Sequence, residues 1–178
     1  NYVESSGSSE QTPCDLGTYQ PNSGQIFCLE SSSGTYVSNT GSSSVSDCSE
    51  GTYQPNSGQS ECIDASPGYF SSSVRASAQT PCLAGSYQPD TGSVTCLQAD
   101  VGYHVPIEGQ NMQTICPAGQ YQPQPSSTEC LITNPGEYSS EGSTSPSPCL
   151  AGSYQSDSGQ SGCVLADAGY YSSEISSI

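Results

Sequence analysis

The sequence predicts a small disulfide-rich fold, mostly irregular with short β-strands, repeated in tandem as an elongated ladder. Three observations predict it. The 178 residues carry 10 cysteines at regular intervals, and glycines recur every 17 residues. Leu, Ile, Val and Phe make up only about 13% of the chain. With a net charge of -16, a chain so poor in apolar side chains is usually disordered unless disulfides compensate for the missing core.

Composition excludes several classes of function. The chain has one basic residue, Arg75, against 17 Asp and Glu, so it lacks the cationic surface that binds nucleic acid or anionic lipid. No apolar run approaches the roughly 20 residues that span a bilayer, so we expect no membrane insertion. With one histidine and no lysine, we expect no catalytic site and no enzyme. The first residues show no signal peptide, which predicts a mature fragment or an excerpt from a longer chain.

The cysteines define a tandem repeat. Short and long intervals between successive cysteines alternate along the chain, which gives a 34-residue unit present five times, with a single deletion in the last long interval. Such periods indicate architectures in which each unit packs on its neighbours. The predicted repeats are 1–33, 34–67, 68–101, 102–135 and 136–168, and a sixth begins at 169–178.

A finer period of 17 residues lies inside the repeat. A ring follows each recurring glycine by two positions, and a second glycine follows most of them by seven. Because glycine adopts positive φ without steric cost, a recurring glycine indicates a recurring turn. Each repeat therefore has two related halves, one with a cysteine pair and one rich in serine. The glycines are Gly17, Gly34, Gly51, Gly68, Gly85, Gly102, Gly119, Gly136, Gly152 and Gly169; the rings are Tyr19, Tyr36, Tyr53, Phe70, Tyr87, His104, Tyr121, Tyr138, Tyr154 and Tyr171.

Short strands are expected near the turns, for example within residues 34–38, with lengths of about three to five residues. No segment has helical periodicity. We expect a small core in each repeat, formed by one disulfide, one or two rings and the aliphatic residue after the second cysteine. The alternative architecture is a β-solenoid with 17-residue rungs. The aliphatic residues are Leu29, Ile63, Leu97, Leu131 and Val164.

Disulfides within each repeat use every cysteine, whereas pairing across the longer intervals leaves Cys14 and Cys163 single. We favour pairing within repeats, although sequence alone does not fix connectivity. Each bond closes a loop of about 15 residues and contributes ~3 kcal/mol. Zinc is the rival explanation, but zinc sites use closer cysteine pairs, so we expect none. Disulfides also predict an extracellular setting. The predicted pairs are Cys14–Cys28, Cys48–Cys62, Cys82–Cys96, Cys116–Cys130 and Cys149–Cys163.

Each cysteine pair opens with the pattern C-x-x-G-x-Y-Q. This pattern resembles the cysteine-rich repeats of ephrin-receptor-like type and is similar to the first disulfide module of tumour-necrosis-factor-receptor cysteine-rich domains. The resemblance covers the segments between paired cysteines, under half of the chain. It implies an extracellular ladder of small disulfide modules, and it agrees with pairing within repeats.

The chain departs from these families in two respects. It lacks the further cysteine that usually follows the second one, and its intervening halves are cysteine-free and rich in serine. The ligand-binding role of a receptor therefore does not carry over. The tandem copies look more like the repetitive surface proteins of microbes.

Other candidate residues have ordinary structural explanations. His104 fills a ring position of the repeat, so we expect a structural role rather than catalysis or metal binding. Arg75 stands where other halves have the second glycine, and we expect it to be exposed. We predict no cofactor. A recurring acidic position could bind calcium weakly, although solvated charge is the favoured explanation; it comprises Glu30, Asp64, Asp100 and Asp167, with Asn134 in the fourth repeat.

Clusters of hydroxyl residues suggest O-glycosylation, as in Ser/Thr-rich stalks. The alternative is a flexible polar linker. No N-x-[ST] sequon is present, so we expect no N-glycans. The candidate acceptors are Ser31, Ser32, Ser33, Ser42, Ser43, Ser44, Ser71, Ser72, Ser73, Thr144, Ser145 and Ser147.

These observations favour a structural protein of an extracellular filament, stalk or surface coat, acidic and located at the cell surface. Its expected partners are copies of itself placed end to end or a longer chain of the same repeats, together with covalent glycans. The alternative is a receptor or adhesin ectodomain that binds a protein or glycan. For that alternative, the fourth repeat is the candidate, because it diverges most.

Overall fold

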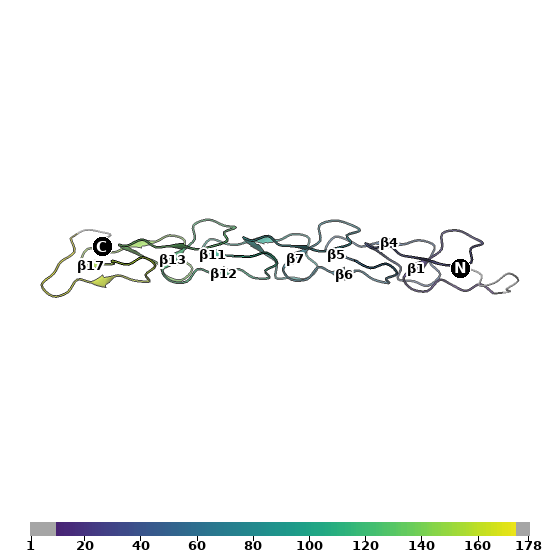
Figure 1. Ribbon diagram of the computed structural model, residues 1–178, viewed down its shortest axis with the longest axis horizontal. Helices are drawn as coiled ribbons and strands as arrows, with labels where there is room; N and C mark the ends of the chain where they lie inside the picture. Colours follow the sequence, from purple (N-terminus) through teal and green to yellow (C-terminus); the bar gives the residue numbers. More distant parts are fainter. Residues whose placement is uncertain (1–9, 174–178) are drawn as a thin grey trace. The chain divides into compact units, whose positions relative to one another are not determined.

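The computed structural model describes residues 10–173, and this range contains short strands, turns and irregular segments but no helix (Figure 1). Every strand is two residues long, shorter than predicted, and the strands pair into nine antiparallel two-stranded sheets. The strands are β1 (Thr18–Tyr19), β2 (Leu29–Glu30), β3 (Thr35–Tyr36), β4 (Ser46–Asp47), β5 (Thr52–Tyr53), β6 (Ile63–Asp64), β7 (Tyr69–Phe70), β8 (Thr80–Pro81), β9 (Ser86–Tyr87), β10 (Leu97–Gln98), β11 (Tyr103–His104), β12 (Thr114–Ile115), β13 (Gln120–Tyr121), β14 (Leu131–Ile132), β15 (Glu137–Tyr138), β16 (Ser147–Pro148), β17 (Ser153–Tyr154) and β18 (Val164–Leu165).

The chain divides into two compact units. The first comprises Asn1–Pro81 and Asp90–Cys96, and the second comprises Cys82–Pro89 and Leu97–Ile178. The first unit contains the hairpins from β1–β2 to β7–β8, and the second contains those from β9–β10 to β17–β18. Within each unit the hairpins follow one another in chain order (Figure 1).

Each 17-residue half folds into the same hairpin, which begins with a glycine turn. In the hairpin of β5 and β6, the Thr52 N–H donates to the Ser49 carbonyl (3.0 Å), and Gly51 has φ +84°. A positive φ at the third position of a four-residue turn is the signature of a type II turn, which favours glycine. Strand β5 then pairs with β6, and the Ala65 N–H donates to the Gly51 carbonyl (2.9 Å) to close the hairpin.

Successive hairpins within a unit are joined through their backbones. The Gly34 N–H donates to the Gln54 carbonyl (2.7 Å), and the Val37 N–H donates to the Gln59 carbonyl (3.0 Å). In the second unit, the same bonds run from Gly102 to Gln122 and from Val105 to Ser127. A third bond returns from the later loop to the earlier turn, from Gly58 to Ser31 and from Ser126 to Ala99.

This pattern distinguishes the observed fold from the alternative solenoid. Among the described residues, every named strand pairs within its own hairpin, and no sheet runs from hairpin to hairpin. The bonds between hairpins involve the turns, the ends of strands and the loops instead. The fold is therefore a small disulfide-rich chain of hairpins, as the sequence predicted. Each hairpin corresponds to one interval between successive recurring glycines.

The core of the hairpins consists of small or polar side chains. One buried position lies three residues before the turn glycine and holds Cys, Ser, Ala or Thr; another lies three residues after it and holds Gln, Val or Ser. The first set is Cys14, Ser31, Cys48, Ala65, Cys82, Ala99, Cys116, Thr133 and Cys149; the second is Gln20, Val37, Gln54, Ser71, Gln88, Val105, Gln122, Ser139 and Gln155.

The predicted core was wrong about the aliphatic residue after the second cysteine. These side chains keep between 37% and 51% of their surface exposed. Each lies on the second strand opposite the ring of the first, which is itself half-buried in all five hairpins. The pairs are Tyr19 with Leu29, Tyr53 with Ile63, Tyr87 with Leu97, Tyr121 with Leu131 and Tyr154 with Val164.

The loop of each hairpin contains a second residue with positive φ. Two of these positions lack glycine: Arg75 has φ 64° and Ser126 has φ 58°. Gly142 fills the position in the half that is one residue shorter, with φ 71°. The missing residue therefore falls in the loop before Gly142, and the bond from Gly142 to the Cys116 carbonyl (2.8 Å) is retained.

Replacing a turn glycine tests how closely the hairpins approach. We expect Gly51→Ala to destabilise the chain by about 3 kcal/mol or more, because its Cβ would overlap the Gly92 carbonyl in addition to the unfavourable φ. Urea unfolding followed by tyrosine fluorescence would measure the change. The matched control is Gly152→Ala, at φ +89°, whose Cβ meets no atom within 4 Å; it should cost only about 1–2 kcal/mol. Equal losses would contradict the close approach.

Candidate functional site

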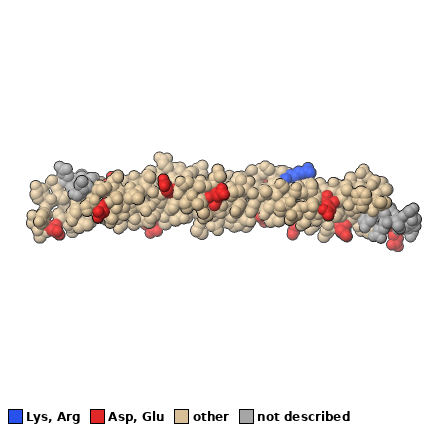
Figure 2. Space-filling model, viewed as in Figure 1, with Lys and Arg blue, Asp and Glu red and all other residues tan. Residues whose placement is uncertain are grey.

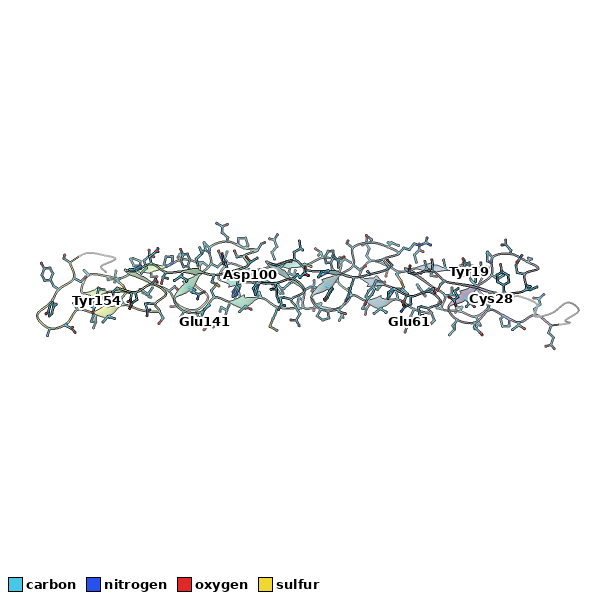
Figure 3. The ribbon with its side chains drawn as sticks, in the orientation of Figure 1. Tyr19, Cys28, Glu61, Asp100, Glu141 and Tyr154 are labelled. Atoms are coloured by element: carbon cyan, nitrogen blue, oxygen red, sulfur yellow. A yellow bond between two sulfur atoms is a disulfide. The ribbon has the colours of Figure 1, made fainter. Side chains whose placement is uncertain are left out.

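The disulfides pair the cysteines within repeats, as predicted. The four bonds are Cys14–Cys28, Cys48–Cys62, Cys116–Cys130 and Cys149–Cys163, with Cα atoms 5.7–5.8 Å apart. Cys82 and Cys96 are also disulfide-bonded, and no cysteine is free among the described residues, which include all ten. In every pair the first cysteine is buried and the second is half-buried. Tyr19 and Cys28 of the first such hairpin are labelled in Figure 3.

A buried glutamine amide fixes the loop that the disulfide closes in four of these hairpins. Gln54 is 2% exposed; its Nε2 donates to the Glu61 carbonyl (2.9 Å), and its Oε1 accepts from the Asn56 N–H (3.1 Å). Glu61 directly precedes Cys62, so the amide holds the chain beside the disulfide. A buried amide is stable only when both ends are paired. The arrangement recurs at Gln20, Gln122 and Gln155.

The cysteine-free hairpins of the third and fourth repeats, β7–β8 and β11–β12, use a hydrogen bond where the others have a disulfide. Ala65 and Gln79 occupy the positions equivalent to a cysteine pair, with the same spacing along the chain. The Ser66 N–H donates to Gln79 Oε1 (2.7 Å). Gln113 accepts in the same way from the Asp100 N–H (2.7 Å) and donates to Asp100 Oδ2 (2.7 Å). Sequence reasoning missed this role, although the repeated spacing was visible.

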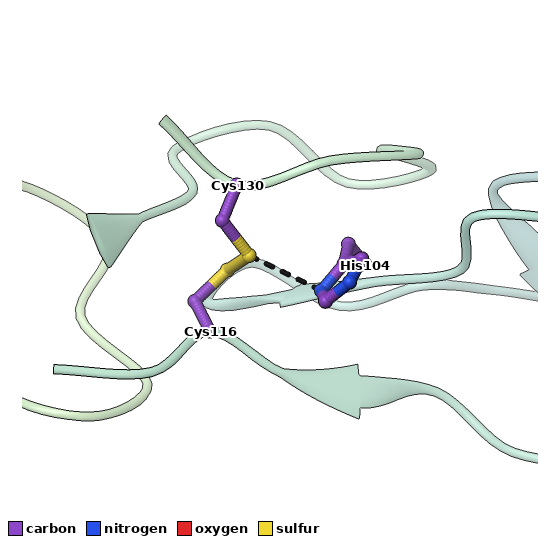
Figure 4. Close-up of side chains that lie close together, drawn as sticks. All are labelled: His104, Cys116 and Cys130. Atoms are coloured by element: carbon purple, nitrogen blue, oxygen red, sulfur yellow. Dashed lines mark hydrogen bonds between the residues drawn. A yellow bond between two sulfur atoms is a disulfide. The ribbon is translucent and has the colours of Figure 1, made fainter. Parts of the chain in front are cut away.

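His104 lies against a disulfide. It occupies β11, is half-buried, and its Nδ1 lies 3.1 Å from Cys130 Sγ (Figure 4). A disulfide sulfur carries no hydrogen, so a hydrogen bond here requires Nδ1 to be the donor. A ring nitrogen of His104 and the Sγ atoms of Cys116 and Cys130 all lie within 4.8 Å of one another. Zinc binds cysteine as the thiolate. Because the sulfurs of Cys116 and Cys130 are bonded to each other, they are not thiolates and do not form a zinc site in this state.

The acidic residues are dispersed on the visible face (Figure 2). The predicted calcium ligands Glu30, Asp64, Asp100 and Asp167 are all exposed. Among the described residues, the only group of three His, Cys, Asp or Glu close enough to hold a metal ion is that of His104 and its two cysteines. The four acids therefore form no such group. Asn134, the fourth repeat's counterpart, donates through its N–H to Glu137 Oε2 (3.3 Å).

Arg75 is exposed, as expected, and its Nε lies 3.8 Å from Asp47 Oδ1. Both side chains are about half exposed to solvent, with 57% and 45% of their surface accessible. Exposed ion pairs of this kind contribute at most about 1 kcal/mol. Arg75 therefore stabilises its loop little, and its backbone remains in the left-handed region with φ 64°.

Two of the predicted glycan acceptors are inside the fold. Ser31 is 0% exposed and its Oγ donates to the Gln59 carbonyl (3.3 Å); Ser71 is 3% exposed and donates to the Thr52 carbonyl (2.9 Å). A glycosyltransferase cannot reach these hydroxyls without unfolding the hairpin. The other ten candidates are exposed or half-buried.

Comparison with known families gives one match. Residues 1–48 match the family model described as tyrosine-protein kinase ephrin type A/B receptor-like. Residues 1–48 therefore carry an ephrin-receptor-like cysteine-rich repeat. The match covers the first disulfide hairpin and the cysteine-free hairpin after it, and the remaining cysteine pairs repeat the same spacing. No curated protein sequence is significantly similar to the chain.

These repeats and their disulfides indicate an extracellular or secreted domain, because disulfides persist in oxidising compartments. Over residues 10–173, no helix has the length and apolarity needed to cross a membrane.

The equivalence of the two kinds of hairpin can be tested by adding a disulfide. We expect Ala65→Cys combined with Gln79→Cys to form a sixth disulfide, since both residues occupy cysteine positions of the repeat. The new bond should add about 3 kcal/mol, less about 1 kcal/mol for the lost Gln79 hydrogen bond. Thiol titration and urea unfolding would measure both effects. Ala65→Cys with Thr80→Cys is the control, and two free thiols in the first variant would contradict the equivalence.

Proposed function

We propose that the chain is a structural, non-catalytic component of an extracellular filament, stalk or surface coat. The observation that supports this function best is the backbone joint between successive hairpins. The joint repeats along each unit with bonds such as Gly17 to Val37 and Gly119 to Ser139, both 2.9 Å. Because it uses main-chain groups, an array of any length can be assembled from the same contacts.

The disulfides support the same role. Each bond lies within one repeat, so each repeat is cross-linked independently of the next. Side chains contribute little apolar burial, and covalent loops of about 15 residues supply about 3 kcal/mol each instead. This design suits a spacer exposed to proteases outside the cell. The proposed partners are further copies of the chain or a longer array of the same repeats.

We propose O-glycosylation on the accessible hydroxyls of the loops. Their exposure supports this assignment, because it leaves the hydroxyls open to a glycosyltransferase. The proposed acceptors are Ser32, Ser33, Ser42, Ser43, Ser44, Ser72, Ser73, Thr144, Ser145 and Ser147.

Mass spectrometry of protein from its native source tests the glycosylation. We expect intact masses above the 18.3 kDa of the polypeptide, in steps of sugar units, with modified peptides that contain the accessible acceptors. Ser31 and Ser71 should remain unmodified because they are buried. The same chain made in bacteria is the unglycosylated control. A native mass equal to that of the bare polypeptide would contradict the proposal.

Electron microscopy of native material tests the structural role. We expect fibres or a continuous surface layer that label with antibody against the repeats, because end-to-end contacts whose rotation does not close give open filaments. Treatment with a reductant should disperse them, since each repeat depends on its disulfide. Isolated short particles in native samples would contradict an assembled filament or coat.

A receptor or adhesin ectodomain is the alternative proposal. The fourth repeat is the candidate site because its sequence diverges most from the others. It also exposes Ile107 and Met112 by 61% and 64%, and exposed apolar side chains can anchor a partner. Deletion of residues 102–135 should then abolish attachment to cells or glycans, whereas deletion of residues 68–101, which also removes one whole repeat, should not. Equal attachment by both deletions would exclude a site in the fourth repeat.

A further inference from the structure

His104 gives one disulfide a neighbour that the others lack. It is the only histidine of the chain and occupies a ring position that holds Tyr36, Phe70 or Tyr138 in the other cysteine-free hairpins. His104 contacts Cys130. The separation along the chain between His104 and Cys130 equals that between Tyr36 and Cys62, so Tyr36 is the counterpart of His104 at the second disulfide. Tyr36 and Cys62 both line one hollow of about 290 Å³, so that ring and the second disulfide border the same space.

In other respects the five disulfides are alike. The first cysteine of each pair is buried and the second is half-buried. Four of the bonds have nearly the same Cα separation, 5.7–5.8 Å. Accessibility therefore gives no reason for one bond to react before another. The Nδ1 of His104, 3.1 Å from Cys130 Sγ, is the chemical difference (Figure 4).

We propose that Cys116–Cys130 is a redox-active disulfide that a dithiol reductant opens before the other four. A thiolate of the reductant attacks Cys130 Sγ, the half-buried sulfur. The bond between the two cysteine sulfurs breaks, and Cys116 leaves with the electron pair and takes up a proton. The second thiolate of the reductant then attacks the reductant sulfur that is bonded to Cys130. This closes the disulfide of the reductant and expels Cys130 as a thiolate.

The balance of this reaction assigns a role to His104. The reductant loses two electrons and two protons and becomes a disulfide, while the protein gains a Cys116 thiol and a Cys130 thiolate. The second proton resides on His104, whose imidazolium then faces the thiolate. A thiolate beside an imidazolium is stabilised, and a stabilised thiolate is also the better leaving group. The first effect favours the reduced form of this pair over reduced pairs that face tyrosine or phenylalanine, and the second speeds the expulsion of Cys130 in the second step.

Site-resolved reduction of the intact chain tests the proposal. The folded protein is treated with limiting dithiothreitol, quenched with acid, alkylated and mapped by mass spectrometry for each cysteine. We expect Cys116 and Cys130 to be alkylated roughly tenfold faster than the other eight cysteines. In glutathione redox buffers, the same pair should be reduced at a potential about 30 mV higher, which is a tenfold change in equilibrium constant.

Two variants separate the role of histidine from that of local structure. His104→Tyr installs the residue that Tyr36 and Tyr138 place at the same position, so it preserves the hairpin, and it should abolish the early opening. Tyr36→His places an imidazole beside Cys48–Cys62, and that bond should become labile in addition. Circular dichroism verifies that both variants fold. Equal opening of all five disulfides in the native chain would overturn the proposal, as would early opening of Cys116–Cys130 that persists in His104→Tyr.

Discussion

The close approach of backbone to backbone at the turn glycines is the constraint on which the rest of the structure depends. Gly51 is buried, has a positive φ, and its Cα faces the Gly92 carbonyl two hairpins further along the chain, where a Cβ would overlap it. Main-chain groups therefore occupy the space between hairpins that side chains fill in ordinary proteins. A fold joined in this way needs few large apolar residues, which accounts for a composition that resembles disorder.

With the joints made by the backbone, the side chains serve mainly to hold each hairpin in shape. The same position is secured by a disulfide in one hairpin and by a glutamine amide in another, as in Cys48–Cys62 and Ser66–Gln79. The two solutions differ in strength and in chemistry. The covalent one resists unfolding but reacts with thiols, whereas the hydrogen-bonded one is indifferent to redox conditions. Alternating them gives the third and fourth repeats one element of each kind.

The sequence predicted the features that depend on local geometry and missed those that depend on side-chain orientation. Regular glycines indicate turns because few other residues adopt positive φ, and cysteine spacing favours the pairing that leaves none unpaired. The exposure of Leu29 could not be predicted, because strands of two residues show no alternation of polar and apolar positions. The burial of Ser31 was missed for a related reason: its neighbours in a serine run look identical, and only the hairpin register places Ser31 inside.

The uniform joint between hairpins has a genetic consequence. Since the same backbone bonds connect every hairpin within a unit, and one loop has already lost a residue without losing them, insertion or loss of a whole repeat creates no new interface that selection must optimise. Gain or loss of a repeat would then change the copy number without altering the contacts between hairpins. The number of repeats can therefore vary while the folding chemistry of each hairpin stays constant.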